Sequence, residues 1–186
     1  MAATGRVLPL GTVFSKPSPY GVVEVRKSVR GHTFLWIDGV TQMMVGGNSE
    51  GEAELVQDGM KLCSPDKVFL AGLGAPHNAR EILNYPVKHV DCYEINPVVV
   101  EAQTYFPAVL IDERYHLHIG DAREALEQVD SEYDCIFIDV EEKTRGHSAW
   151  FFTDEGRAAM RKAVKIGGYV CVWDFAGGTI TRRMNG

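Results

Sequence analysis

Three carboxylates in this sequence stand directly after short apolar stretches. Glu94 follows "HVDCY", Asp121 follows "HLHIG", and Asp139 follows "YDCIFI". Because ligands of open parallel sheets bind outside the carboxyl ends of the strands, we expect these three acids to line one crevice. Carboxylates in such a place accept hydrogen bonds from sugar hydroxyls and amines, and they can take a proton from a reacting group. The sequence therefore predicts a site for a small polar ligand.

A glycine turn precedes these acids. Residues 68–83, "VFLAGLGAPHNAREIL", predict a buried strand, a turn containing Gly72 and Gly74, and a helix. In a dinucleotide-binding turn, a third glycine allows close helix packing beside the pyrophosphate, but His77 stands at that position. Glu94 lies 20 residues after Gly74, which is about the offset of an acid that binds ribose hydroxyls. An adenosyl ligand without phosphates, S-adenosylmethionine or its decarboxylated form, fits better than NAD.

Each acid also has a structural alternative, because a carboxylate after a strand can cap the helix that follows. For Glu94, which precedes "INP", we favour a ligand contact with the ribose. For Asp121, which precedes "AREAL", helix capping and a contact with the adenine amine both stay open, and one side chain could serve both.

From Lys67 onward, strands and helices are expected to alternate. The apolar stretches predict strands at 67–72, 89–95, 116–120, 133–139 and 168–174, with helices at 77–84, 97–105, 122–128 and 153–165. Short apolar strands separated by helices indicate a parallel sheet covered on both faces.

The preceding part of the chain has a different pattern. Residues 21–29, 32–38 and 40–45 predict short strands joined by turns at Arg30-Gly31 and Asp38-Gly39, and a helix is expected over 49–62. We therefore divide the chain into an N-terminal β-strand region, residues 1–48, and an α/β domain, residues 49–186.

Composition excludes several classes of function. The 186 residues are 45% hydrophobic with a formal net charge of −6, which disfavours a nucleic-acid partner. No run of about 18 apolar residues predicts a membrane span, and the first residues lack a secretory signal. Three of the four cysteines lie in apolar strands, so we expect reduced core thiols and a cytoplasmic location. His116 and His118 have metal-like spacing without a second ligand cluster, so we expect no metal.

Together these segments resemble the spermidine synthase family of aminopropyltransferases. The similar segments are "LWIDGVTQ", "KVFLAGLGAPHNAREIL", "CYEINPVVVEAQTYFP", "HLHIGDAREAL" and "YDCIFIDVEEK". The resemblance implies a methyltransferase-like Rossmann sheet preceded by a small N-terminal β-hairpin domain, in a homo-oligomer that is often a dimer. It also implies polyamine biosynthesis, in which an aminopropyl group passes from decarboxylated S-adenosylmethionine to a putrescine-like amine.

The resemblance also implies roles for individual residues. Gln42 would contact the nucleoside, Glu94 the ribose and Asp121 the adenine, while Asp139 and Glu142 lie in the catalytic stretch. Further contacts with the adenosyl ligand are expected from Gly72, Gly74, Ala75, Ile95 and Ala122.

Several positions depart from the family pattern. Ala75 stands where the family has an aspartate, and Glu142-Lys143 replaces its second aspartate and proline. The chain ends at Gly186, soon after the fifth expected parallel strand, so we expect the antiparallel strands that complete this fold to be missing. An aspartate at position 75 would repel the carboxylate of intact S-adenosylmethionine, so its loss admits that ligand too. Elimination, methyl transfer, and a non-catalytic nucleoside-binding or scaffolding role are the alternative functions.

Overall fold

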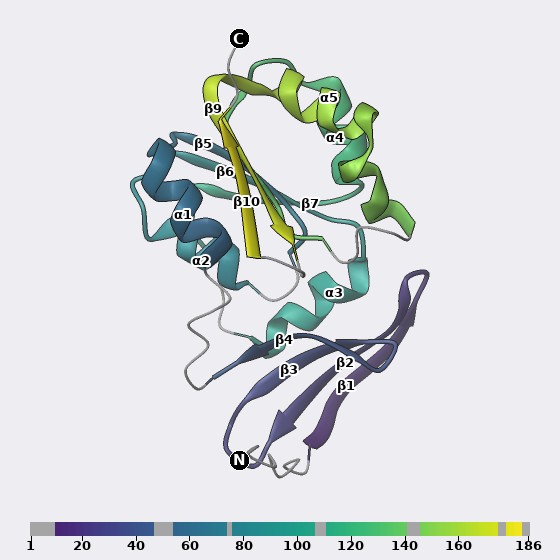
Figure 1. Ribbon diagram of the computed structural model, residues 1–186. Coiled ribbons are helices and arrows are strands. Elements are labelled where there is room, and N and C mark those ends of the chain that lie inside the picture. Colours follow the sequence, from purple (N-terminus) through teal and green to yellow (C-terminus); the bar gives the residue numbers. More distant parts are fainter. Residues whose placement is uncertain are drawn as a thin grey trace, which may run out of the picture.

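The computed structural model describes residues 10–46, 54–73, 76–106, 111–140, 146–174 and 178–183. It contains two sheets, as Figure 1 shows. The first is antiparallel with the strand order β1-β2-β3-β4, formed by β1 (Leu10–Ser18), β2 (Gly21–Ser28), β3 (Thr33–Ile37) and β4 (Val40–Val45). Asp38 and Gly39 join β3 to β4 with positive φ angles of 47° and 77°. Such a turn suits the twist of a tight hairpin, as the Asp-Gly pair predicts.

The second sheet has the order β10-β9-β8-β5-β6-β7. Its strands are β5 (Lys67–Ala71), β6 (His89–Glu94), β7 (Tyr115–Ile119), β8 (Tyr133–Ile138), β9 (Val164–Asp174) and β10 (Gly178–Arg183). The helices are α1 (Glu54–Cys63), α2 (His77–Leu83), α3 (Pro97–Ala102), α4 (Ala122–Gln128) and α5 (Asp154–Ala163), with 3-10 turns η1 (Gln103–Tyr105) and η2 (Gly146–Phe152). Strands β5 to β9 pair in parallel. The predicted α/β class is confirmed.

Helices cover both faces of this sheet, with α1 and α2 on one side and α4 and α5 on the other (Figure 1). The alternation of β5 explains the two layers. Val68 and Leu70 pack with α1 and α2, whereas Phe69 and Ala71 pack with α4 and α5. A strand buried on both faces reads as a continuous apolar run, which is the pattern of "VFLA".

Helix α3 connects the two sheets. Val98, Val99 and Ala102 of α3 pack against Val23 and Leu35 of the N-terminal sheet. Asn96 begins this helix by accepting a hydrogen bond from the Val98 N–H (3.0 Å), and Pro97 occupies the first helical position. The N-terminal sheet is thereby held close to the carboxyl end of β6, which ends at Glu94, two residues before Asn96.

Two expectations about the C-terminal part of the large sheet were wrong. Strand β9 begins at Val164, where the sequence predicts the end of a helix, because α5 ends at Ala163. The chain also continues past the last parallel strand into β10, which pairs antiparallel with β9. Arg182 and Arg183 are the last two residues of β10. The sequence pattern did not predict strand β1 as a separate element. Of the helix expected over 49–62, residues 49–53 lie outside the described residues.

The four cysteines are free thiols, and three of them are buried in the large sheet. This confirms that they are core residues rather than a disulfide framework. Among the described residues, no helix combines the length and the hydrophobicity that crossing a membrane requires.

Candidate functional site

The carboxyl ends of four parallel strands form the edge at which the predicted site residues lie. In the sheet register, Ala71 of β5 pairs with Tyr93 of β6 and with Ile138 of β8, and Glu94 of β6 pairs with Ile119 of β7. The glycine turn and the three acids directly follow or occupy these positions, so they emerge at the same edge. The structure thus brings together residues that are far apart in the sequence.

Gly72 is required by the way the turn packs. Its φ is +92°, and a Cβ atom at this position would lie 2.0 Å from the backbone oxygen of Asp139. The N–H of Gly72 donates to the carbonyl of Tyr93 (2.9 Å), and the N–H of Asp139 donates to that of Ala71 (2.9 Å). The end of β8 is therefore pressed against the turn, and only glycine fits between them. Gly74, Ala75 and Glu142 lie outside the described residues.

Glu94 is buried and accepts hydrogen bonds from the backbone. The N–H of Leu73 donates to its Oε2 (3.1 Å), and the N–H of Asn96 donates to its Oε1 (2.8 Å). Backbone donors offset the cost of burying this carboxylate. Asn96, rather than Glu94, caps the following helix by accepting from Val98. Through the hydrogen bond from Leu73, Glu94 stabilises the glycine turn. The next residue, Ile95, is half-buried.

Asp121 caps α4, which confirms the structural alternative for this residue. Its Oδ1 accepts from the N–H of Arg123 (2.9 Å), and the Arg123 guanidinium forms an ion pair with the same carboxylate. The N–H of Gly120 donates to the carbonyl of Glu94 (2.9 Å), so the two acids leave neighbouring strand ends. Ala122 is buried as the first residue of the helix.

Asp139 contacts a residue that sequence reasoning missed. Its Oδ2 accepts a hydrogen bond of 2.6 Å from Nδ2 of Asn78, which lies in the first turn of α2. Asn78 is buried beside Ala79 and Ile82, which also face inward. A polar residue on the apolar side of "HNAREIL" was the available signal. It could not show which partner the amide would meet.

Gln42 lies in a β-bulge. Leu35 pairs with Met43 and Trp36 pairs with Thr41, so Gln42 is the extra residue of β4. Bulges of this kind bend a strand and re-aim a side chain, often next to a functional site. One residue beyond Met43, the carbonyl of Met44 lies 3.4 Å from Nε2 of His77, the first residue of α2. The N-terminal sheet therefore reaches the helix that follows the glycine turn.

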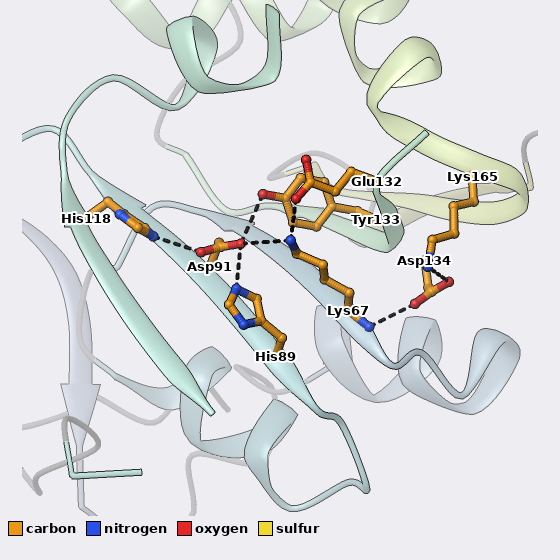
Figure 2. Close-up of polar contacts among 8 residues, drawn as sticks. All are labelled: Lys67, His89, Asp91, His118, Glu132, Tyr133, Asp134 and Lys165. Carbon is orange, nitrogen blue, oxygen red and sulfur yellow. Dashed lines mark hydrogen bonds and ion pairs between the residues drawn. The ribbon is translucent and has the colours of Figure 1, made fainter. Parts of the chain in front are cut away.

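A second polar cluster surrounds Asp91 on the face of the sheet (Figure 2). Its carboxylate is approached by Nε2 of His118 (2.8 Å), Nε2 of His89 (2.9 Å), the hydroxyl of Tyr133 (3.1 Å) and Nζ of Lys67 (3.8 Å). These groups come from four adjacent strands. The cluster therefore ties β5, β6, β7 and β8 together through one carboxylate.

The histidines with metal-like spacing belong to this part of the sheet. His118 bonds Asp91, and the ring of His116 stacks on that of His89 with centroids 4.3 Å apart. Within the described residues, no group of three or more His, Cys, Asp or Glu side chains is arranged to hold a metal ion.

We expect Asp91→Asn to lower stability by about 1.5–3 kcal/mol near neutral pH, since hydrogen bonds to a charged group are lost. Burial raises the pKa of Asp91, but bonds from His118 and Tyr133 and the charge and bond of His89 outweigh it, so the pKa lies below its ordinary value of 3.8. The carboxylate therefore stabilises the fold above pH 3.8 and loses this effect as pH falls through the folded-state pKa.

Thermal unfolding from pH 7 to pH 3 checks this prediction. The difference in Tm between wild type and Asp91→Asn is expected to shrink below about pH 4. Asp58→Asn, the same change at an exposed residue of α1, is the matched control. A difference that stays constant down to pH 3 would contradict the assigned role of the carboxylate.

Comparison with known proteins identifies the same family as the sequence motifs. Residues 50–174, more than half of the chain, match the spermine/spermidine synthase domain. Spermidine synthase from Coffea arabica is 30% identical over 168 residues, 86% of this chain and 52% of that protein. Putrescine N-methyltransferase 2 from Nicotiana tabacum is 29% identical over 166 residues, 86% of this chain and 46% of that protein. The chain thus spans about half the length of these curated relatives.

The fold has a close counterpart among solved structures. A spermidine synthase crystallised with the transition-state analogue AdoDATO superimposes with a TM-score of 0.77 and 24% identity, over 87% of this chain and 57% of that one. This likeness concerns the fold alone. With the family match over residues 50–174, the resemblance inferred from the motifs is confirmed, and the chain belongs to the spermine/spermidine synthase domain family.

Proposed function

We propose that this chain binds decarboxylated S-adenosylmethionine and transfers its aminopropyl group to an amine of a polyamine such as putrescine. The observation that carries the proposal is the shared sheet edge at which the Gly72 turn meets Glu94, Asp121 and Asp139. Family membership supports the same chemistry, and the named spermidine synthase and methyltransferase relatives are transferases.

The ligand would lie across the strand ends. Glu94 would accept hydrogen bonds from the ribose hydroxyls, in addition to the backbone N–H groups that it already holds. Asp121 would accept from the adenine amine while it continues to cap α4. Gln42, aimed by the bulge of β4, would contact the nucleoside from the N-terminal sheet.

The reaction is a displacement at the carbon next to the sulfonium. The amine nitrogen forms a bond to that carbon, the carbon–sulfur bond breaks, and its electron pair returns to sulfur as neutral methylthioadenosine leaves. A carboxylate accepts the proton released by the amine. Asp139, which directly follows β8, would be this acceptor. A carboxylate there also attracts the cationic amine before reaction.

Position 75 affects which sulfonium compound binds. Ala75 offers no carboxylate where the resemblance implies an aspartate. The missing charged hydrogen bond corresponds to about 1.5–3 kcal/mol, or roughly tenfold or more in affinity. Its absence also removes the repulsion that would exclude the carboxylate of intact S-adenosylmethionine.

Methyl transfer is the second candidate function. It is favoured by the similarity to putrescine N-methyltransferase 2, which covers 86% of this chain, together with Ala75. The two reactions share the amine and the sulfonium, but they leave different thioethers. Aminopropyl transfer leaves methylthioadenosine, whereas methyl transfer leaves S-adenosylhomocysteine.

Mass spectrometry of the products distinguishes these reactions. The chain is incubated with each sulfonium compound, with and without putrescine. We expect spermidine and methylthioadenosine only with the decarboxylated donor and the amine. Methylputrescine with S-adenosylhomocysteine would support methyl transfer instead, and methylthioadenosine without any amine would indicate elimination. Nucleoside binding without any product would support the non-catalytic alternative and overturn the proposal.

We expect Glu94→Gln to weaken binding of methylthioadenosine about tenfold or more, because a charged acceptor for the ribose is lost. Methylthioadenosine is uncharged, so calorimetry with it reports the hydrogen bonds rather than attraction of a sulfonium. Glu127→Gln, at an exposed residue of α4, is the matched control. Unchanged affinity in a folded Glu94→Gln protein would place the ribose elsewhere.

A further inference from the structure

Asn78 lies against the proposed proton acceptor, although 61 residues separate the two in sequence. Its side-chain Nδ2 donates to Oδ2 of Asp139 over 2.6 Å, and the residue is only 5% exposed. An ionised carboxylate accepts hydrogen bonds and donates none, so the NH₂ group of the amide must face Asp139. The orientation of the amide is therefore set by chemistry.

The carbonyl oxygen of the same amide lowers the stability of the fold. Oδ1 of Asn78 is buried and has no hydrogen-bond partner in the described part of the chain. A buried acceptor without a partner costs about 1–3 kcal/mol. The neighbouring inward residues of α2, Ala79 and Ile82, are apolar and belong to a core cluster. An apolar side chain would suit this position better, so packing does not explain the asparagine.

We propose that Asn78 is a positioning residue for Asp139 in the transfer reaction. By holding Oδ2, it restricts rotation of the carboxyl group and so sets where both oxygens lie. A hydrogen bond to the charged form also favours that form, which keeps Asp139 able to accept a proton and to attract a cationic amine. This inference rests on the proposed function of Asp139.

Three independent contacts make Asp139 a site where orientation can be controlled. Its backbone N–H donates a hydrogen bond to the carbonyl of Ala71, and its backbone oxygen lies in close contact with Gly72. Its side chain accepts a hydrogen bond from Asn78. The first two contacts fix the backbone of Asp139. The third acts on the carboxyl group itself, and Asn78 supplies it from the helix that follows the glycine turn.

The test compares wild type with Asn78→Leu, which has a similar size but no donor. We expect kcat to fall about 10- to 100-fold with little change in KM for the donor. The acidic limb of the pH profile should move up by about one pH unit or more. Tm should be unchanged or higher, because the unmatched carbonyl oxygen is removed. Asn84→Leu, the same change at the exposed end of α2, is the matched control.

A double mutant shows whether Asn78 acts through Asp139. In an Asp139→Asn background, Asn78→Leu should change the residual rate by less than about twofold, since coupled residues are not additive. Carbon-13 NMR of labelled aspartate provides a readout that needs no turnover. The titration midpoint of the Asp139 carboxyl group should rise in Asn78→Leu.

The possible failures are distinguishable. If wild type makes no product, the proposed function fails and the catalytic part of this inference fails with it. If wild type is active but Asn78→Leu retains its kcat and the NMR midpoint, the positioning role is overturned alone. Equal losses of Tm, nucleoside binding and rate would show that Asn78 has only a structural role, which also overturns the inference.

Discussion

Asp139→Asn is expected to lower the rate of transfer to putrescine by about 10²- to 10⁴-fold, the usual contribution of a positioned acid or base. Asparagine has nearly the same shape but cannot accept the amine proton. It also removes the negative charge that attracts a cationic amine. Since the proposed nucleoside contacts belong to Glu94 and Asp121, affinity for methylthioadenosine should remain within a fewfold of wild type.

The measurement is steady-state kinetics with separate variation of donor and amine. Most of the loss should appear in kcat and in the KM for the amine, rather than in the KM for the donor. Asp130→Asn, at an exposed residue outside the strands, makes the same chemical change away from the site. A variant with near-normal kcat would show that another group takes the proton. Glu142 is the next candidate, as the sequence motif implies.

Gly72→Ala is expected to have the largest effect on stability. The added Cβ would lie 2.0 Å from the backbone oxygen of Asp139, and the φ of +92° disfavours any side chain. The atom that the Cβ would meet belongs to the backbone rather than to a flexible side chain. Gly72 directly follows β5 and Asp139 directly follows β8, so neither backbone can move easily. Strain and overpacking together suggest a loss of about 3–5 kcal/mol. This corresponds to a fall in Tm of roughly 10 °C.

Gly39→Ala separates the two contributions. Gly39 has a similar φ of +77°, but a Cβ atom added there would meet no neighbouring atom within 4 Å. We expect it to lose only about 1–2 kcal/mol, from the backbone conformation alone. Urea unfolding of both variants measures the difference. Equal losses would contradict the close packing of the turn against β8.

The Gly72 variant also connects stability with activity. To relieve the clash, the backbone of Asp139 must move away from the turn, and its carboxyl group would move with it. A shift of about 1 Å in a reacting group can lower a rate about 100-fold. Residual Gly72→Ala protein that is folded at low temperature should therefore still be less active than wild type.

Much of the fold follows from local sequence patterns. The continuous apolar run "VFLA" predicted a strand buried on both faces, and β5 is such a strand. "GDAREAL" predicted a helix and left capping by Asp121 as one of two open roles, and Asp121 does cap α4. Asp38-Gly39 predicted a hairpin turn. These features depend on residues within a few positions of one another, so the sequence alone specifies them.

Other features depended on contacts between distant segments. The bulge at Gln42 arises from its register with β3, and β10 forms because β9 offers an edge with which it can pair. The cluster at Asp91 requires the order of four strands, which no local pattern contains.

The candidate site shows the same division. The sequence by itself determined that Glu94, Asp121 and Asp139 follow parallel strands and that a glycine turn precedes them. Only the tertiary structure decided that Asn78 donates a hydrogen bond to Asp139 and that Glu94 accepts one from the backbone N–H of Leu73. It also decided that there is no space for a side chain at Gly72. The physical reason is that strand propensity and helix capping act over a few residues. Hydrogen bonds between side chains and close backbone packing depend on which strands become neighbours.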